Sequence, residues 1–263
     1  MPEQINVVGL DGSVRGNIER PAAFSEAVRP EIISRAATAE LTRELQPQGH
    51  YHLAGMETSA AYHGRMSSYR SGRHMGQAIR PREHLGGGRQ GKVRRIPSAV
   101  KGRRAHPHLP EKRIIESINA TEYRKAIASA VAATALSDYV KCERTLPVVV
   151  SDEIQALKKT RDVVALVGKL GLKSAIADSN AHIRKGIRRS ASQRHYKRTI
   201  LLVVKDDDGI LKAARNIRGF DVCDVSSLRA NLLAPGGRPG RLTVWSEPAV
   251  KALDTAIGGL SLK

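Results

Sequence analysis

The chain has 263 residues, of which 44 are Lys or Arg and 25 are Asp or Glu, and its formal net charge is +19. Two cysteines are too few for a disulfide framework, and no apolar run approaches the roughly 20 residues that a membrane-spanning helix needs. Glu3, Gln4 and Asn6 interrupt the first apolar residues, which argues against a secretory signal. These features exclude a disulfide-stapled secreted domain and a membrane protein, so we expect a soluble intracellular protein with an anionic partner.

The first part of the chain predicts a β-hairpin followed by a long helix. Ile5–Val8 and Val14–Ile18 have the composition of strands, and the turn dipeptide Asp11-Gly12 lies between them. Residues 25–45 have apolar residues near one helical face. Pro30 is compatible with that helix only near its first turn.

Helical order is expected to return at Asn119. Asn119 has the N-cap position, with Glu122 three residues later, and the helix is expected to continue to Tyr139. The β-branched run Leu146–Val150 follows without alternation, as in a strand that is covered on both faces. These patterns predict a helix packed on a buried sheet.

Strands and helices alternate through the rest of the chain. Strands separated by helices of about ten residues predict an α/β fold, with a single mostly parallel sheet flanked by helices. The expected elements are a short helix from Ser151, a helix over Arg161–Leu170, a weak strand over Lys173–Ala177, a buried strand over Thr199–Val204, a helix from Asp208 to Asn216, strands over Asp221–Val225 and Leu242–Trp245, and a final helix from Ser246 to about Ile257.

A long basic segment interrupts this α/β pattern. Tyr62–Arg113 has 14 basic residues against two acidic residues, eight glycines and no helical or alternating period. Such a segment cannot bury enough apolar surface to offset the entropy of ordering it, so it is either disordered or ordered by another molecule. Its charge and its length indicate that such a molecule would be a large anion. We therefore assign residues 1–46 and 114–263 to a globular α/β domain and residues 47–113 to an extended basic loop inserted after the first long helix.

The composition of the basic segment favours RNA as that molecule. Arg outnumbers Lys eleven to three, and the planar guanidinium suits bidentate phosphate contacts and stacking on bases. A localisation signal or a basic linker favours consecutive lysines and needs no apolar residues between them. Duplex DNA is the weaker alternative. A loop of about 26 residues each way, at ~3.3 Å per residue, can reach roughly 85 Å. That is far deeper than the groove of a duplex requires, and it suits a large folded RNA. The candidate RNA-binding residues of the loop are Arg65, Arg70, Arg73, Arg80, Arg82, Arg89, Lys92, Arg94, Arg95, Lys101, Arg103 and Arg104.

A second basic segment lies nearer the end of the chain. Asp178–Arg198 has seven basic residues and one acidic residue, and we expect Ala181–Arg198 to be a loop between strands that clamps RNA. Tyr62, Tyr69 and Tyr196 are candidates for stacking on unpaired bases. The candidate residues of this second segment are Arg184, Lys185, Arg188, Arg189, Arg194, Tyr196, Lys197 and Arg198.

Three patterns could indicate catalysis or a bound cofactor, and each has a simpler explanation. Gly86–Lys92 fits seven positions of a Walker loop, but Val93 stands where Ser or Thr should ligate Mg²⁺. His106-Pro-His108 offers two zinc ligands without a nearby Cys. Four acids near strand ends could bind two metal ions, which makes a metal-dependent nuclease the alternative function. These acids are Asp152, Asp178, Asp206 and Asp224. The simpler explanation is that acids after strands commonly cap helices. We expect no catalytic residue, metal or cofactor.

Several motifs together resemble a known family. Ile96-Pro-Ser-Ala-Val-Lys-Gly-Arg103 and Ser71-Gly-Arg73 through Gly76-Gln77 resemble the loop of large-subunit ribosomal protein four (universal L-four), in its archaeal and eukaryotic branch. Pro147-Val-Val-Val-Ser-Asp152 and Leu233–Val244, which contains Pro239-Gly-Arg-Leu-Thr-Val244, resemble its globular domain. The resemblance is nearly end to end, and no long C-terminal extension is seen, which favours the archaeal type.

The resemblance implies a role that composition does not show. Members of this family bind large-subunit rRNA early in assembly, contact neighbouring ribosomal proteins, and extend their loop to the wall of the peptide exit tunnel. It implies a non-enzymatic ribosomal component that contacts the nascent peptide and is not expected to form homo-oligomers. The tip of the loop would be Arg70, Ser71, Gly72, Arg73, His74, Met75, Gly76 and Gln77.

Overall fold

The computed structural model divides the chain into two compact units. Met1–Glu44 together with Ile115–Lys263 form the first unit, here the body, and Leu45–Ile114 form the second, here the loop unit. The structure describes residues 4–67, 69, 71–93, 96–142, 144–185 and 194–260. Among these residues, no helix has both the length and the apolar composition to cross a bilayer.

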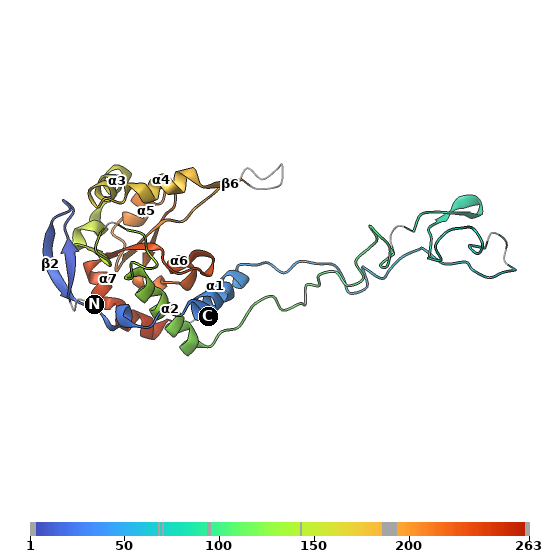
Figure 1. Ribbon diagram of the computed structural model, residues 1–263, viewed down its shortest axis with the longest axis horizontal. Helices are drawn as coiled ribbons and strands as arrows, with labels where there is room; N and C mark the ends of the chain where they lie inside the picture. Colours follow the sequence, from blue (N-terminus) through green and yellow to red (C-terminus); the bar gives the residue numbers. More distant parts are fainter. Residues whose placement is uncertain are drawn as a thin grey trace. The chain divides into compact units, whose positions relative to one another are not determined.

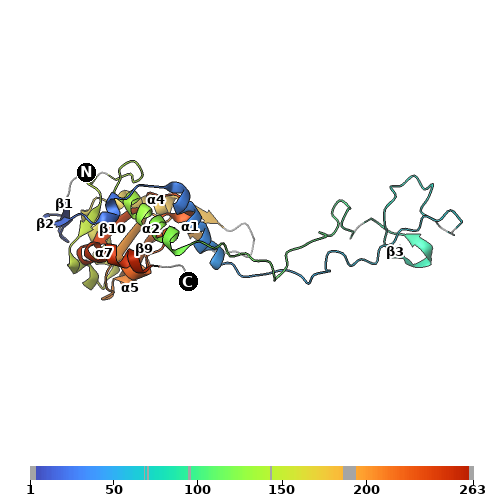
Figure 2. The same cartoon turned by 90° about the horizontal axis from the view of Figure 1, so that it is seen from below.

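The body is built on a six-stranded sheet with the order β2-β1-β5-β10-β8-β9. The β1–β2 pair is antiparallel and lies at one edge, whereas every other pair is parallel (Figures 1 and 2). The mostly parallel sheet and the first hairpin confirm the predictions from sequence. The strands are β1 (Gln4–Val8), β2 (Val14–Glu19), β5 (Val148–Val150), β8 (Ile200–Val204), β9 (Phe220–Asp224) and β10 (Leu242–Ser246).

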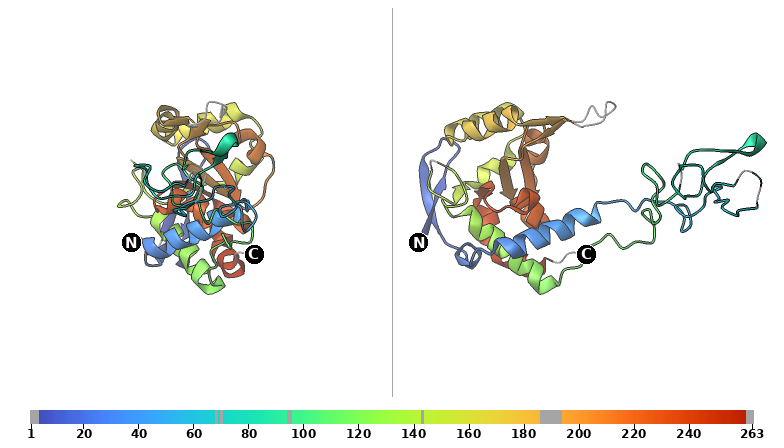
Figure 3. Two further views of the ribbon diagram at one scale, coloured as in Figure 1. Left: turned by 90° about the vertical axis from the view of Figure 1, so that its right-hand side faces the viewer. Right: turned by 45° about the vertical axis from the view of Figure 1, so that its right-hand side comes forward.

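Helices cover both faces of the sheet, as Figure 3 shows. Strand β8 is buried at every position: Ile200, Leu202 and Val204 pack in one apolar cluster, whereas Leu201 and Val203 pack in the other. This explains why the strand is apolar without alternation. The first face is covered by η1 (Ala22–Ser25), α1 (Pro30–Arg43), α2 (Ala120–Thr134), η4 (Val225–Ser227), α6 (Ala230–Leu233) and α7 (Glu247–Gly259). The second face is covered by η3 (Asp152–Ala156), α3 (Thr160–Lys169), α4 (Lys173–Ala181) and α5 (Ile210–Ala214).

One predicted element has the wrong type. Lys173–Ala177, expected as a weak strand, is the first part of helix α4. Ala175 and Ile176 pack against the second apolar cluster and Ser179 is fully buried, so the pattern from Leu172 onward has the helical spacing of three and four residues. The Ala-Ile-Ala sequence concealed this spacing.

Helix α2 begins where it was predicted, but its capping contact and its end differ from the prediction. Asn119 is its N-cap residue, but the Asn119 side chain makes no capping hydrogen bond, and Glu122 instead pairs with Arg35 at 2.9 Å. The helix ends at Thr134 and not at Tyr139. Ser and Asp at positions 137 and 138 favour a turn there, because their side chains compete for backbone hydrogen bonds.

Candidate nucleic-acid interface

Within the loop unit, two glycines allow the outgoing and returning arms to touch. The backbone N–H of His50 donates to the carbonyl oxygen of His108 at 3.0 Å. A Cβ at Gly49 would lie 1.9 Å from that His108 oxygen, and a Cβ at Gly55 would lie 2.0 Å from the carbonyl oxygen of Arg104. The arms can therefore pair only because these positions have no side chain.

The loop cations face outward. Among the described candidates, Arg82 is half-buried and the others are exposed: Arg65, Arg73, Arg80, Arg89, Lys92, Lys101, Arg103 and Arg104. Arg70, Arg94 and Arg95 lie outside the described residues.

Three of these arginines also organise the loop unit itself. Arg80 donates to the carbonyl of Ser98 at 2.8 Å, Arg82 donates to that of Ala78 at 3.1 Å, and Arg103 donates to that of Glu57. A guanidinium has five N–H donors, so each retains donors for phosphate.

The loop unit has almost no apolar core. Ile96, at 3% exposure, is its only buried large apolar side chain among the described residues. Seven large aliphatic side chains of residues 47–113 are half or more exposed, namely Leu53, Met56, Met66, Met75, Ile79, Leu85 and Val100. At the expected tip, Ser71 and Gly72 are half-buried, whereas Arg73, His74, Met75, Gly76 and Gln77 are exposed. This surface is apolar and cationic together, which suits contact with bases and phosphates.

The second basic segment has a different structure from the one expected. Strands β6 (Ile183–Lys185) and β7 (Arg194–Tyr196) pair as an antiparallel hairpin, with Arg184 opposite His195. Because residues 173–181 are helical, the segment connects helix α4 to strand β8, and the expectation of a loop between strands is wrong. Arg184, Arg194, Lys197 and Arg198 are exposed, and Arg188 and Arg189 lie outside the described residues.

A cationic cavity, here the basic groove, lies between this hairpin and the segment before β10. Its volume is about 850 Å³. Arg238 and Arg241 line it together with residues of the hairpin, and no carboxylate is among its described lining residues. Its basic side chains are Arg184, Lys197, Arg198, Arg238 and Arg241.

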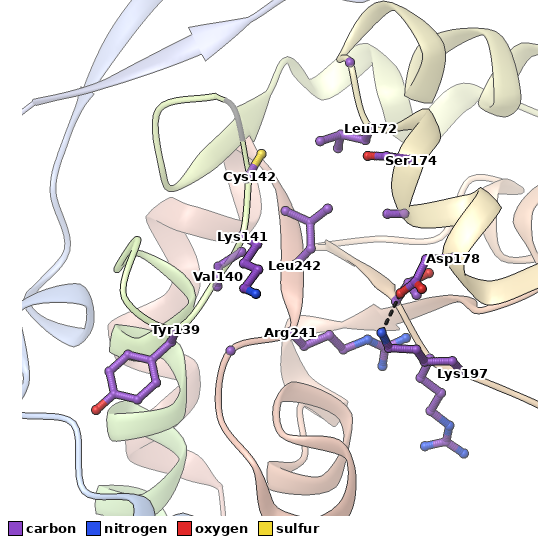
Figure 4. Close-up of a pocket in the computed structure, with 15 residues that line it drawn as sticks. Tyr139, Val140, Lys141, Cys142, Leu172, Ser174, Asp178, Lys197, Arg241 and Leu242 are labelled. Carbon is purple, nitrogen blue, oxygen red and sulfur yellow. Dashed lines mark hydrogen bonds and ion pairs between the residues drawn. The ribbon is translucent and has the colours of Figure 1, made fainter. Parts of the chain in front are cut away.

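A second cavity, here the amino-edge pocket, adjoins the basic groove and has a volume of about 730 Å³. Lys197, Arg198, Gly240 and Arg241 line both. Figure 4 shows Tyr139 and Lys141 on one side of the pocket and Leu172, Ser174 and Asp178 on the other. Both cavities lie where strands β8 and β10 begin, the opposite edge from the carboxyl ends at which open α/β sheets usually bind ligands.

Arg241 supports the walls of both cavities. Its side chain is 1% exposed and donates to the carbonyls of Ile200 and Leu232 and to Asp221 Oδ2, the last at 2.6 Å. Burial lowers the pKa of Arg241, and the Asp221 carboxylate opposes that shift. Site residues outside the two basic segments, such as Arg241 and Arg238, were not predicted, although Arg241 lies in the Pro239–Val244 motif.

The tyrosines proposed for stacking have different surroundings. Tyr62 and Tyr69 are exposed in the loop unit, at 40% and 84%. Tyr196 is half-buried, and the guanidinium of Arg218 lies 5.1 Å from its ring centroid. One face of the Tyr196 ring is thus already occupied by a cation.

The four acids considered for a nuclease do not converge. Asp178 lies in the amino-edge pocket, whereas Asp152 and Asp206 follow the carboxyl ends of β5 and β8, and Asp224 is the last residue of β9. Within the part of the chain that the structure describes, no three His, Cys, Asp or Glu side chains are grouped so that they could hold a metal ion. Burial, followed by repulsion from Asp207 and Asp206, raises the pKa of Asp224.

Comparison with known proteins identifies the family. The model of the ribosomal protein L4/L1 family matches residues 18–256. The chain belongs to the ribosomal protein L4/L1 family. Three proteins named large ribosomal subunit protein uL4 are similar to this member of the L4/L1 family. That of Archaeoglobus fulgidus is 40% identical over 255 residues, which cover 94% of this chain and 96% of the relative.

The other two relatives are also archaeal. The protein of Methanococcoides burtonii is 38% identical over 257 residues, with 95% of this chain and 97% of the relative covered. That of Methanocaldococcus jannaschii is 40% identical over 257 residues, with 94% and 96% covered. The archaeal type of the L4/L1 family that the sequence motifs indicated is confirmed. As a member of this family of ribosomal proteins, the chain is a structural protein and not an enzyme.

Proposed function

We propose that the chain is a primary rRNA-binding component of the large ribosomal subunit in the cytoplasm, and that it joins the subunit early in assembly. The composition of the loop unit is the observation that carries this proposal. Among the described residues, most of its cations and most of its large apolar side chains are exposed, and Ile96 is its only buried large apolar side chain. A segment of this kind gains its order from a partner, and its charge requires an anionic one. Family membership supports rRNA as that partner.

Residues 47–113 act in this proposal as an extended loop that penetrates folded rRNA. Phosphate contacts come from the exposed arginines, and Arg70–Gln77 form the tip that lines the exit tunnel beside the nascent peptide. The exposure of Arg73 through Gln77 supports this role, since these side chains are not used for packing within the loop unit. Arg70 is included from the sequence alone.

The body contributes a second contact through the basic groove. Its five basic side chains, without a described carboxylate among them, form a track for a phosphodiester backbone. Body and loop unit together would hold separate rRNA segments, and neighbouring ribosomal proteins would contact the remaining surface. One copy of the chain acts in each subunit.

Reconstitution tests the proposal. The chain should co-sediment with large subunits and resist a high-salt wash, and it should bind naked large-subunit rRNA before most other subunit proteins are added. A photo-reactive amino acid at Met75 should cross-link to a stalled nascent peptide, whereas the same group at Val164, exposed on α3, should not. Release at moderate salt would contradict the assembly role, and equal cross-linking from both positions would contradict the tunnel assignment.

The rival function, a metal-dependent nuclease, predicts a different result. Incubation with labelled rRNA and Mg²⁺ should leave the RNA intact. Site-specific cleavage that is abolished by Asp152→Ala or Asp206→Ala would refute the structural role.

A further inference from the structure

The amino-edge pocket has the size and lining of a receptor for one nucleobase. Its volume of about 730 Å³ lies within the range of roughly 300–1,000 Å³ that is typical of small-ligand sites. Leu172 and Leu242, which are 3% and 8% exposed, contribute apolar wall surface. Apolar walls of this kind can hold the faces of a planar base, provided that polar groups meet its edge.

The polar groups at one side of the pocket are an acceptor and a donor placed next to each other. The Lys197 ammonium binds Asp178 Oδ2, as the dashed line in Figure 4 shows, and His182 Nδ1 lies 2.9 Å from Asp178 Oδ1. The hydrogen bond from Lys197 lowers the pKa of Asp178, so the carboxylate is ionised at neutral pH. Each carboxylate oxygen accepts more than one hydrogen bond, so both retain capacity for a ligand.

This pair matches the pairing edge of guanine better than that of another base. Guanine presents two adjacent donors, N1–H and the N2 amino group, beside the O6 acceptor. A carboxylate accepts from both donors while a neighbouring ammonium donates to O6. Adenine and cytosine place a ring-nitrogen acceptor beside their amino group, where it would face the carboxylate, and uracil offers a single N–H between two carbonyls. Asp178 and Lys197 therefore discriminate by hydrogen-bond complementarity.

The basic groove supplies the rest of a nucleotide site. It shares Lys197, Arg198, Gly240 and Arg241 with the pocket and contains Arg184 and Arg238 as further cations. A strand whose phosphates follow the groove can therefore insert one base into the pocket without a break in contact. Arg241 keeps this junction rigid, because its buried guanidinium fixes the carbonyl of Ile200 at 2.8 Å.

We propose that the amino-edge pocket binds a single unpaired guanine of rRNA, with Asp178 reading N1–H and N2–H, Lys197 reading O6, and the basic groove holding the flanking phosphates. This inference rests on the proposed rRNA-binding function, and it adds a base-specific site to it.

Cys142 allows a direct test with the full-length chain, because it lines the pocket. It is half-buried, whereas Cys223, the second free cysteine, is buried, and burial also raises the pKa of the Cys223 thiol. Alkylation of each cysteine is followed by mass spectrometry in the presence of GMP, AMP or UMP, with Cys223 as the internal reference. GMP should protect Cys142 at a concentration about tenfold or more below AMP and UMP, as expected for a bidentate contact.

Variants separate the pocket from general charge. Ser174→Trp should fill the pocket and abolish protection, whereas Ala177→Trp, at an exposed position of α4 outside the pocket, should not. Asp178→Asn should remove the preference for GMP, because an amide replaces one acceptor by a donor. The thermal transition of each variant is recorded to verify that it is folded.

Binding to large-subunit rRNA is measured in parallel by filter retention. Protection by GMP that Ser174→Trp alone abolishes would support the inference. Equal protection by the three nucleotides, or no protection at saturating GMP, would overturn the guanine site. If rRNA binding is intact in that case, the proposed function still stands. Failure of the wild-type chain to bind rRNA would refute the proposed function, and the inference with it.

Discussion

Glu40 of α1 accepts a hydrogen bond from the hydroxyl of Tyr123 of α2, and the two oxygens are 2.6 Å apart. Glu40 is 7% exposed and also accepts hydrogen bonds from the backbone N–H groups of Ala230 and Asn231 at the start of α6, at 2.7 and 2.8 Å. Helix α1 ends just before the loop unit in sequence, and α2 begins just after it. One buried carboxylate thus joins the helices that flank the insertion.

Replacement of this carboxylate should destabilise the body. Glu40→Ala would leave the Tyr123 hydroxyl and the N–H groups of Ala230 and Asn231 without their acceptor, at a cost of about 2–4 kcal/mol. Chemical denaturation measures the free energy of unfolding. Glu44→Ala, at the exposed end of α1, is the matched control and should change it by less than about 0.5 kcal/mol. Similar losses in both variants would show that Glu40 has no special role.

The same hydrogen bond predicts a dependence on alkaline pH. Burial, followed by the hydrogen bond to Glu40, raises the pKa of Tyr123 above its ordinary value. A group whose folded pKa is raised stabilises the fold fully below its unfolded pKa, about 10 for Tyr, and loses that contribution as the pH rises further. The stability of the wild type should therefore fall more steeply above pH 10 than that of Tyr123→Phe. Parallel pH profiles of Tm would contradict this.

Much of the fold follows from the local pattern of apolar residues in the sequence, whereas the contacts of Glu40 do not. The apolar runs of β5, β8 and β10 indicated a parallel sheet because buried strands need no alternation. The role of Glu40 depends on a partner 190 residues away in sequence, and no local signal marks it. Helix α4 was missed because its Ala-Ile-Ala sequence concealed the helical spacing of its buried positions.

The candidate site was predictable to a similar extent. Charge and glycine content identified the loop and the second basic segment, because a segment without a core must be ordered by a partner. Arg238 and Arg241 were missed because they line the basic groove only through the turn before β10. Their spacing in the sequence does not indicate this position. The pairing of Gly49 with His108 likewise depends on the return path of the loop.

A side chain at Gly49 or Gly55 should separate the arms of the loop unit. The Cβ of Gly49→Ala would lie 1.9 Å from a backbone oxygen, so the His50–His108 hydrogen bond would be lost. Because the body has its own core, its thermal transition should not move. Affinity for rRNA should fall about tenfold, the cost of one lost hydrogen bond of about 1.4 kcal/mol. Gly86→Ala, where a Cβ meets no heavy atom within 4 Å, is the control. Equal affinity of the Gly49 and Gly86 variants would refute the pairing of the arms in the bound state.

Removal of exposed loop cations should change the salt dependence of rRNA binding. If Arg65, Arg73 and Arg89 each neutralise one phosphate, replacing all three by Ala should make the slope of log K against log salt shallower by about 2. Titrations at several salt concentrations measure the slope. Lys251→Ala on α7, which removes a cation already paired with Glu247 at 2.8 Å, should leave it unchanged. A uniform loss of affinity with the same slope would mean that the three arginines do not contact phosphate.

Deletion of the loop unit should leave a body that folds cooperatively. Glu116 N–H donates to Thr42 Oγ1 at 3.1 Å, so the chain ends that flank the insertion are already close together within the body. Replacement of Leu45–Ile114 by a short Gly-Ser linker should therefore preserve a single sharp thermal transition, since the core of the body comes from residues outside the deleted segment. The deleted protein should keep the weaker rRNA contact of the basic groove and lose most of the total affinity. If the thermal transition disappears, the loop unit is required for the fold of the body. If full affinity survives, the loop unit is not the principal rRNA-binding element.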